Sequence, residues 1–284
     1  MTAFNFCKFH GFGNDYLVAM RYDIDPKTSL PELGKSICHR HTGVGADGIS
    51  ILEKLDGGMA DYFCEIVNPD GSFAGFSGNG TRCAVSYLYY KGLWSAENLR
   101  LETRSGVKNY RLIERKGSGE FWFEAEIGKP KFGSDEIPVM SDTRLDHVTD
   151  GQLTVNGEEI TFAGVNVGNP VACVFVDDFD FDWRTLGKAM ETHERFPDRA
   201  NIVFVRVMDR ENIEIRIWER AAGETAASGT CASGSAVLSA LMNKTGRNVS
   251  VHSEGGMTLV NWRDDDEMVI TGRADLAFCG TWSL

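Results

Sequence analysis

Short apolar runs, separated by polar and glycine-containing segments, recur along the whole chain and predict many strands. In the first half of the chain these runs cover residues 5–10, 15–20, 48–52, 61–68, 98–103, 107–113 and 120–127. In the second half they cover residues 172–176, 202–207, 213–218, 249–252, 259–262 and 268–270.

Helical periodicity is confined to a few segments. Val85, Leu88 and Tyr89 recur at helical spacing and predict a helix over residues 80–91. Further helices are expected over residues 31–39, 183–193 and 231–242. Strands therefore outnumber helices without a regular strand–helix alternation, which favours an α+β fold over a doubly wound parallel sheet.

The chain contains an internal repeat. Gly13-Asn14 recurs as Gly168-Asn169, 155 residues later, and Ser77-Gly78 recurs as Ser228-Gly229, 151 residues later. Three more residues or short segments recur in the same order. Ile49 matches Ile202, Ile66–Asn68 matches Ile217–Glu219, and Gly106 matches Gly256. Five matches at nearly constant separation indicate a duplicated domain.

The repeat defines two domains. We expect the first to cover residues 1–122 together with the segment 271–284, which lies outside the repeat and returns to the first domain's sheet. The second covers residues 123–270. Two similar domains that face each other create a cleft, and binding sites are common at such interfaces.

Composition and charge narrow the class of protein. A chain of 284 residues, with 42% hydrophobic and 25% charged residues, suits a folded two-domain protein. The net charge is −12 and the 29 Lys and Arg residues are scattered, so no nucleic-acid partner is expected. The first residues lack a signal-peptide pattern, and no apolar run approaches the roughly 18 residues that span a bilayer. We expect a cytoplasmic protein without a membrane partner.

The cysteines point to reduced thiols. Seven is an odd number, and the widely spaced residues include no Cys-x-x-Cys pair, which fits neither a disulfide framework nor a zinc site. These residues are Cys7, Cys38, Cys64, Cys83, Cys173, Cys231 and Cys279.

The two Ser-Gly pairs carry the candidate chemistry. Ser77-Gly78 and Ser228-Gly229 each follow a strand and a polar loop and lead into a predicted helix. The start of a helix offers unpaired backbone N–H groups, which bind a carboxylate or a phosphate. Each serine alone is explained as a helix cap, with the glycines serving tight turns. The matched pair across a duplication favours a shared site for one carboxylate.

The motifs resemble those of the diaminopimelate epimerase family along nearly the whole chain. The resemblance implies an isomerase that needs neither pyridoxal phosphate nor a metal. It also implies two pseudo-symmetric duplicated domains, each a mostly antiparallel curved sheet wrapped around a central helix, with the cleft between them. The segments that carry the resemblance are Lys8–Asp15, Arg40–Gly48, Asn68–Cys83, Gly168–Pro170 and Glu219–Thr230.

The resemblance assigns the site residues. Family members invert the α-carbon of an amino acid with two cysteines, whose positions fall on Ser77 and Ser228 here. A histidine that usually follows the Gly-Asn-Pro motif is replaced by Val171. Asn14, Asn68, Asn169, Asn201 and Arg220 would hold the distal end of the substrate, and Glu219 its amino group. Gly78, Asn79, Gly229 and Thr230 would bind the α-carboxylate.

The serines leave three readings open. A hydroxyl is hardly ionised at pH 7 and needs a neighbouring base, so the protein is an altered isomerase in which Ser77, Ser228 and Glu219 are catalytic, or a non-catalytic amino-acid-binding paralogue. The third reading is a true epimerase with both cysteines exchanged, against which Val171 and Cys231 argue. Cys231 is an alternative catalytic group, and Cys83 is expected to be a buried packing residue. The family resemblance also suggests a homodimer.

Overall fold

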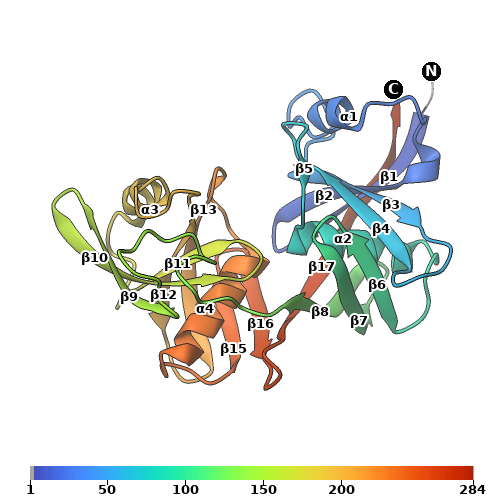
Figure 1. Ribbon diagram of the computed structural model, residues 1–284. Helices are drawn as coiled ribbons and strands as arrows, with labels where there is room; N and C mark the ends of the chain where they lie inside the picture. Colours follow the sequence, from blue (N-terminus) through green and yellow to red (C-terminus); the bar gives the residue numbers. More distant parts are fainter. Residues whose placement is uncertain (1–2, 284) are drawn as a thin grey trace. The chain divides into compact units, whose positions relative to one another are not determined.

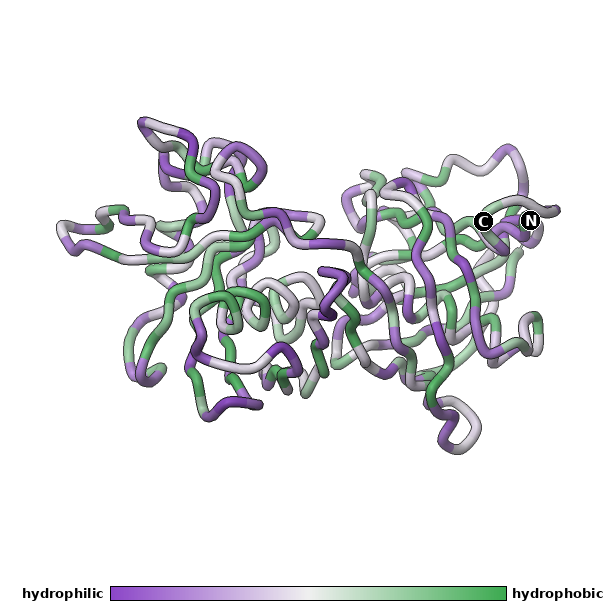
Figure 2. Tube along the Cα trace, turned by 60° about the horizontal axis from the view of Figure 1, so that its bottom comes forward, coloured by the Kyte–Doolittle hydropathy of each residue, from purple (hydrophilic) through white to green (hydrophobic). Residues whose placement is uncertain are grey.

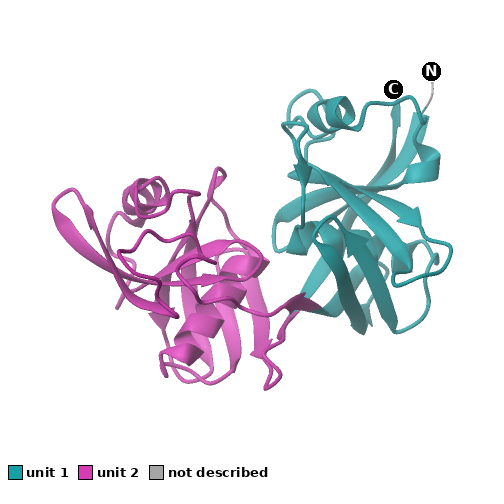
Figure 3. Cartoon of the chain, viewed as in Figure 1, with its two compact units in different colours: residues 1–125, 271–284 teal, residues 126–270 magenta. Residues whose placement is uncertain are grey.

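The computed structural model describes residues 3–283 and divides the chain into two compact units, coloured separately in Figure 3. Unit 1 comprises residues 1–125 and 271–284, and unit 2 comprises residues 126–270. The boundary follows Ala125, where the sequence predicts it after residue 122. Residues 1, 2 and 284, which the sequence assigns to the first domain, lie outside the described residues.

Unit 1 is a ring of strands around a helix (Figure 1). Its hydrogen-bonded order is β17–β1–β2–β3–β4–β6–β7–β8, and β8 pairs with β17, which closes the ring. The steps from β2 to β3 and from β4 to β6 are parallel. The strands are β1 Ala3–Gly11, β2 Asn14–Met20, β3 Gly48–Lys54, β4 Tyr62–Val67, β6 Asn98–Thr103, β7 Gly106–Lys116, β8 Glu120–Gly128 and β17 Met268–Ser283.

The helix at the centre of unit 1 is α2 (Gly78–Tyr90), which packs against β1, β2, β3, β4 and β6. All residues from Asn79 to Tyr89 are buried, because the strands surround the helix rather than cover one face. The strands obey the two-residue alternation of a half-buried sheet, as the burial of β6 and β8 shows. Figure 2 shows the same alternation of hydrophobic and hydrophilic residues along the strands.

Unit 2 repeats this plan around α4 (Gly229–Leu241). Its strands pair in the order β9–β10–β11–β12–β13–β15–β16, and the steps from β11 to β12 and from β13 to β15 are parallel, as at the matching steps of unit 1. The strands are β9 Val148–Val155, β10 Glu158–Asn166, β11 Pro170–Phe175, β12 Asn201–Val207, β13 Asn212–Glu219, β15 Asn248–Ser253 and β16 Gly256–Trp262.

The smaller elements also recur in both units. Helix α1 (Leu30–Ile37) of unit 1 has a counterpart in α3 (Trp183–Glu191) of unit 2. The two-residue strands β5 (Phe73–Ala74) and β14 (Gly223–Glu224) precede the central helices, and a 3-10 turn, η1, covers Arg21–Asp23. The predicted α+β class and the duplication are therefore confirmed.

Several strands differ from the sequence prediction, and β9, β10 and β17 differ most. Neither β9 nor β10 was expected, because polar residues interrupt the apolar pattern, as at Asp150 and at Glu158-Glu159. Strand β17 continues to Ser283, beyond the predicted strand end at Ile270, and its last residues pair with β1, so residues 271–283 return to the sheet of the first domain as predicted. In residues 3–283, none of the helices is both long and apolar enough to cross a membrane.

The expectation of reduced thiols is wrong for two cysteines. Cys7 and Cys279 form a disulfide across 272 residues of sequence, with their Cα atoms 3.9 Å apart. They face each other in the antiparallel β1–β17 pair, and cysteine spacing along the chain carries no information about that register. Cys38, Cys64, Cys83, Cys173 and Cys231 are unpaired and buried.

Candidate functional site

Ser77 begins helix α2. Its hydroxyl accepts a hydrogen bond from the backbone N–H of Gly80 (3.1 Å) and donates one to the Tyr16 hydroxyl (2.9 Å). The backbone of Ser77 is extended (φ −138°, ψ 120°), as expected for a helix cap. The first N–H groups of a helix, here those of Gly78 and Asn79, have no partner within the helix, so they can donate hydrogen bonds to an anion. Ser77 is therefore a helix cap next to N–H groups that lack a partner within the helix.

A chain of side-chain hydrogen bonds fixes two of the predicted amides in unit 1. Asn79 Nδ2 donates to Asn14 Oδ1 (3.1 Å), and Asn14 Nδ2 donates to Asp47 Oδ2 (2.6 Å). Arg82 Nη1 donates to Asn79 Oδ1 (3.2 Å). Each amide therefore has one assigned orientation, and Asn14 and Asn79 are brought together as predicted from the sequence.

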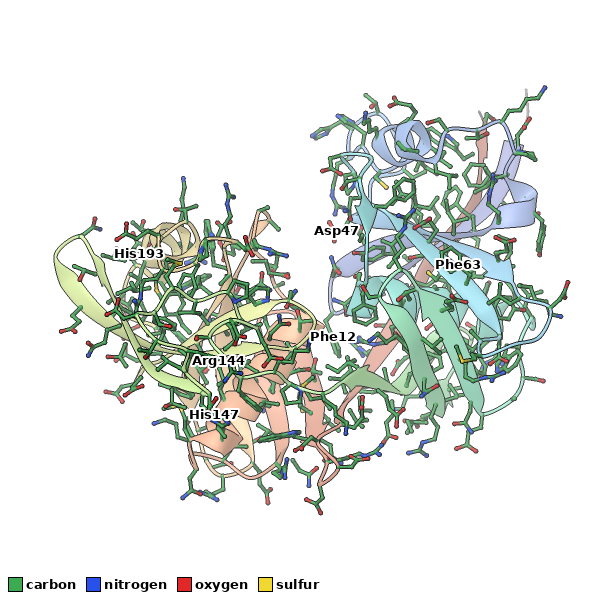
Figure 4. All side chains as sticks on the ribbon, viewed as in Figure 1. Phe12, Asp47, Phe63, Arg144, His147 and His193 are labelled. Atoms are coloured by element: carbon green, nitrogen blue, oxygen red, sulfur yellow. A yellow bond between two sulfur atoms is a disulfide. The ribbon has the colours of Figure 1, made fainter. Side chains whose placement is uncertain are left out.

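Asp15 accepts hydrogen bonds from the two cations beside this network, Arg40 and Lys8. Arg40 donates to both of its carboxylate oxygens (3.0 and 2.8 Å), and Lys8 Nζ lies 2.7 Å from Oδ2. Arg40 also bridges to Asp47, which is labelled in Figure 4. Burial alone would raise the pKa of Asp15, but the hydrogen bonds and charges of Arg40 and Lys8 lower it to about 2. The loop that carries Asp47 is thereby fixed against β2.

Arg82 is a buried cation on α2. It is 1% exposed, and its Nη1 donates to Asn79 Oδ1 and to the backbone oxygen of Arg273 (both 3.2 Å). The guanidinium also lies over the ring of Phe12, labelled in Figure 4. Burial lowers the pKa of Arg82. A Cβ at Gly272 would lie 2.8 Å from Nη1, so the absence of a side chain there makes room for the cation.

Asn68 is placed differently from the other predicted amides of unit 1. It follows β4, and its Nδ2 donates to Ser72 Oγ (2.9 Å), whose hydroxyl donates to Asp70 (2.6 Å). The structure thus ties the Asn68 side chain to the turn before β5, and its contacts do not include Asn14 or Asn79 among the described residues.

Ser228 begins helix α4 and repeats the geometry of Ser77 (φ −146°, ψ 124°). Its hydroxyl accepts from the N–H of Cys231 (3.5 Å) and donates to Glu219 Oε2 (3.1 Å). The hydroxyl of Thr230 lies 3.3 Å away, and Thr225 donates to the other oxygen of Glu219 (2.8 Å). The structure therefore brings Ser228, Glu219 and Thr230 together, and a carboxylate stands beside the serine.

Two predicted amides in unit 2 have unsatisfied buried atoms. Asn201 Oδ1 accepts from the N–H of Arg220 (2.8 Å), while its Nδ2 is buried without a hydrogen-bond partner in the described part of the chain. The same is true of Asn169 Oδ1. An unpaired buried polar atom costs about 1–3 kcal/mol, so both atoms are suited to a ligand. The Arg220 side chain is exposed and donates to the backbone oxygen of Asp198 (3.1 Å).

Glu191, which the sequence analysis missed, fixes the loop that carries Arg220. The carboxylate is 6% exposed and accepts from the Ala221 N–H (2.9 Å) and from Trp218 Nε1 (3.0 Å), and Arg199 lies 3.3 Å away. Burial opposes ionisation of Glu191, but the Ala221 N–H and the other donors lower its pKa. The Ala221 backbone is left-handed (φ 62°), a conformation that this hydrogen bond supports. No local pattern identifies such a residue.

The remaining cysteines near the helix starts are buried within their units. The Cys231 side chain is fully buried, and burial raises its thiol pKa well above the ordinary range. A buried thiol with a raised pKa is poorly suited to the alternative catalytic role. Cys83 is also fully buried, as expected of a packing residue, and burial raises its pKa. Val171 pairs with Asn201 and packs against Gly234 of α4.

Comparisons of sequence place these observations among known proteins. The profile of the family described as diaminopimelate epimerase matches residues 6–132 and 163–277. A diaminopimelate epimerase of Caldanaerobacter subterraneus subsp. tengcongensis is 37% identical over 276 residues, which cover 97% of this chain and 98% of that protein. One of Pelotomaculum thermopropionicum is 36% identical over 281 residues, covering 98% of each chain.

Solved structures share the fold at low sequence identity. A hydroxyproline epimerase from Agrobacterium vitis matches with a TM-score of 0.71 and 16% identity, over 100% of this chain and 93% of the other. A phenazine biosynthesis protein of the PhzF family from Bacillus anthracis matches with a TM-score of 0.70 and 15% identity, over 100% of both chains.

Proposed function

The chain belongs to the diaminopimelate epimerase family, and from this premise we propose that it is a cofactor-independent isomerase that inverts the α-carbon of an amino acid. Ser77 and Ser228 occupy the two positions of proton transfer in this proposal. The observation that carries it is the hydrogen bond from the Ser228 hydroxyl to the Glu219 carboxylate (3.1 Å). A serine needs a neighbouring base to remove a proton, and Glu219 is such a base.

Substrate binding in this proposal uses one helix start from each unit. The N–H groups of Gly78, Asn79, Gly229 and Thr230 bind the α-carboxylate, because helix starts attract anions and stabilise the negative charge that develops when the α-proton leaves. The unsatisfied atoms of Asn169 and Asn201 support a polar ligand in unit 2. The groups proposed for the distal end of the substrate are Asn14, Asn68, Asn169, Asn201 and Arg220.

The decisive experiment follows the α-proton by NMR in deuterated water. Candidate amino acids, including the stereoisomers of diaminopimelate, are incubated with the protein, and both α-proton loss and stereochemistry are recorded. Exchange with inversion supports the isomerase. The E219Q variant is expected to lose at least 100-fold in exchange rate, since the amide cannot accept the proton. If wild type and E219Q exchange equally, Glu219 is not the base.

A second candidate function is amino-acid binding without turnover. The observation that favours it is the burial of Cys83 and Cys231, which leaves no exposed thiol in the first turn of either central helix among the described residues. A ligand that binds only the folded state raises the melting temperature. Thermal stabilisation by an amino acid without any α-proton exchange would establish this function instead of the first.

The family suggests diaminopimelate as the substrate, and we propose to test this by restoring both thiols. The S77C/S228C variant should gain epimerase activity on diaminopimelate if the remaining binding groups suit that substrate. A variant that binds diaminopimelate but stays inactive would point to another altered group, such as Val171. Failure to bind it would indicate a different amino acid.

The cellular setting is also a proposal. We propose a cytoplasmic homodimer without a nucleic-acid or membrane partner, for which sedimentation and fractionation are the tests. Reducing compartments keep most thiols free. Thiol titration of denatured protein taken rapidly from cells should count five thiols where the Cys7–Cys279 disulfide persists, and seven where the compartment reduces it.

A further inference from the structure

The two cap serines differ in the group that receives their hydroxyl hydrogen bond. Ser228 donates to the carboxylate of Glu219 at 3.1 Å, and Ser77 donates to the phenol of Tyr16 at 2.9 Å. The helix caps are otherwise alike in backbone angles and in their acceptance of one backbone N–H. A carboxyl group has an unperturbed pKa near 4.3 and a phenol near 10, so the partners differ in protonation at neutral pH.

The ring of Tyr16 occupies space that Gly48 and Gly80 leave open because they lack side chains. A Cβ on Gly48 would lie 2.7 Å from Tyr16 Cε1, and a Cβ on Gly80 would lie 2.8 Å from the same atom. Gly48 is the register partner of Tyr16 in the parallel β2–β3 pair, and Gly80 lies in the first turn of α2. The ring is 6% exposed. Side chains at either glycine would displace the ring and its hydroxyl from Ser77.

We infer that Tyr16 is a positioning residue for Ser77, and that it makes Ser77 the proton-returning group while Ser228 with Glu219 is the proton-removing group. This inference rests on the proposed function. At neutral pH the Glu219 carboxylate can accept a proton through Ser228. The phenol of Tyr16 already carries its proton, so it can supply one through Ser77 but does not accept one.

The proton movements balance. The Cα–H bond of the substrate breaks, its proton moves to Ser228 Oγ, and the Ser228 hydroxyl proton moves to Glu219. The electron pair stays on the substrate and is delocalised into its carboxylate. Ser77 then gives its hydroxyl proton to Cα and takes the phenolic proton of Tyr16, because hydroxyl hydrogens rotate to suit either direction. Exchange with water returns Glu219 and Tyr16 to their starting states.

Introduced thiols test the two environments without any need for activity. The S77C and S228C variants place a titratable sulfur at each cap, and the pH dependence of alkylation by iodoacetamide measures its pKa. The five native unpaired cysteines are buried, so the wild type supplies a low background. A hydrogen-bond donor lowers a thiol pKa and a nearby carboxylate raises it. We expect a lower thiol pKa in S77C than in S228C.

Removal of each partner should shift these values in opposite directions. Adding Y16F to S77C should raise the thiol pKa by about one unit, so that alkylation at pH 7 slows about tenfold. Adding E219Q to S228C should lower it. The matched control is Y110F in S77C, because the Tyr110 hydroxyl also contacts the start of α2, through Thr81 (2.6 Å). Equal effects of Y16F and Y110F would overturn the inference.

Substrate exchange supplies the second readout. In Y16F, inversion should fall at least tenfold while α-proton exchange on the face served by Ser228 stays within about twofold, and Y110F should change neither. A merely structural role of Tyr16 would lower both rates together, which would contradict the inference. If the wild type exchanges no α-proton, the proposed function fails, and the thiol pKa values still decide whether Tyr16 controls the Ser77 position.

Discussion

At the residue scale, Asp15 illustrates how a buried charge depends on its donors. Its side chain is 12% exposed and is paired with Arg40 and Lys8, which hold its pKa at about 2. An unfolded aspartate titrates near 3.9. Because the folded pKa is the lower of the two, the stabilising contribution is complete above pH 4 and is lost as the pH falls toward 2.

The D15N variant tests this contribution. An asparagine forms no ion pair with Arg40 or Lys8, so unfolding free energy at pH 7 should fall by about 2 kcal/mol. At pH 2 to 2.5, close to the folded pKa, the carboxyl is partly protonated in the folded protein and almost fully protonated in the unfolded chain, so the difference should shrink to less than half. Urea unfolding at both pH values measures it. An equal deficit at both would show that packing, not charge, accounts for the loss.

Glu191 gives a second prediction at this scale. In E191Q the neutral amide oxygen accepts weaker hydrogen bonds than the carboxylate does. The amide NH₂ group also points toward one of the present donors, the Ala221 N–H or Trp218 Nε1, so the turn at Ala221 is less stable. We expect a loss of about 1–3 kcal/mol in unfolding free energy and weaker substrate binding through the adjacent Arg220. The control is E224Q, which removes an exposed carboxylate paired with Arg184. Equal losses in both variants would contradict a special role for Glu191.

At the scale of elements, the central helices need close contact with the strands around them. In α2 this contact requires glycine at position 80, because a Cβ there would lie 2.8 Å from the Tyr16 ring. Alanine favours helices more than glycine does, so propensity alone predicts that G80A is stabilising. Overpacking of a buried contact predicts the opposite sign and costs about 1–3 kcal/mol.

We expect the steric effect to prevail in G80A, measured by thermal and urea unfolding. Its control is G229A at the start of α4, where the new Cβ would meet only Ile270 Cδ1 at 3.4 Å, an ordinary contact distance. Adding Y16L should recover part of the loss, and the double-mutant cycle gives the coupling between the two positions. A stabilised G80A protein would mean that the ring moves aside at little cost.

The sequence predicted the elements well where periodicity was strong. Residues 98–103 were predicted and observed as one strand, and both central helices begin within two residues of their predicted starts. It failed at β9 and β10, where polar residues on the exposed face break the apolar pattern. Tertiary pairing stabilises such strands, and a local pattern does not record it.

At the scale of the whole molecule, the disulfide joins the first and last strands of the ring in unit 1. Cys7 and Cys279 enclose nearly the whole chain, and a link of this kind restricts the unfolded state. Reduction, or the C279S substitution, should therefore lower the unfolding free energy by about 2–4 kcal/mol. Calorimetry with and without reductant measures the change, and C279S should lose all further sensitivity to reductant.

The outcome that contradicts this prediction is an equal effect of reductant on wild type and on C279S. The five other cysteines are unpaired, so they offer reductant no second disulfide in the described residues. A control with C38S, which changes a buried thiol outside the disulfide, separates the effect of a lost link from that of a lost side chain.

The sequence by itself determined the duplication, the α+β class and the two Ser-Gly helix starts, because spacing and periodicity are local properties that one chain displays directly. Only the tertiary structure showed that Tyr16 lies beside Ser77. Glu219 lies nine residues before Ser228 and was identified from the sequence, whereas Tyr16 lies 61 residues before Ser77 and was not. Strand register likewise decided the Cys7–Cys279 pair, and packing decided the burial of Cys231. Register and packing bring together residues that are distant in the sequence, and no periodic pattern in the sequence records these contacts.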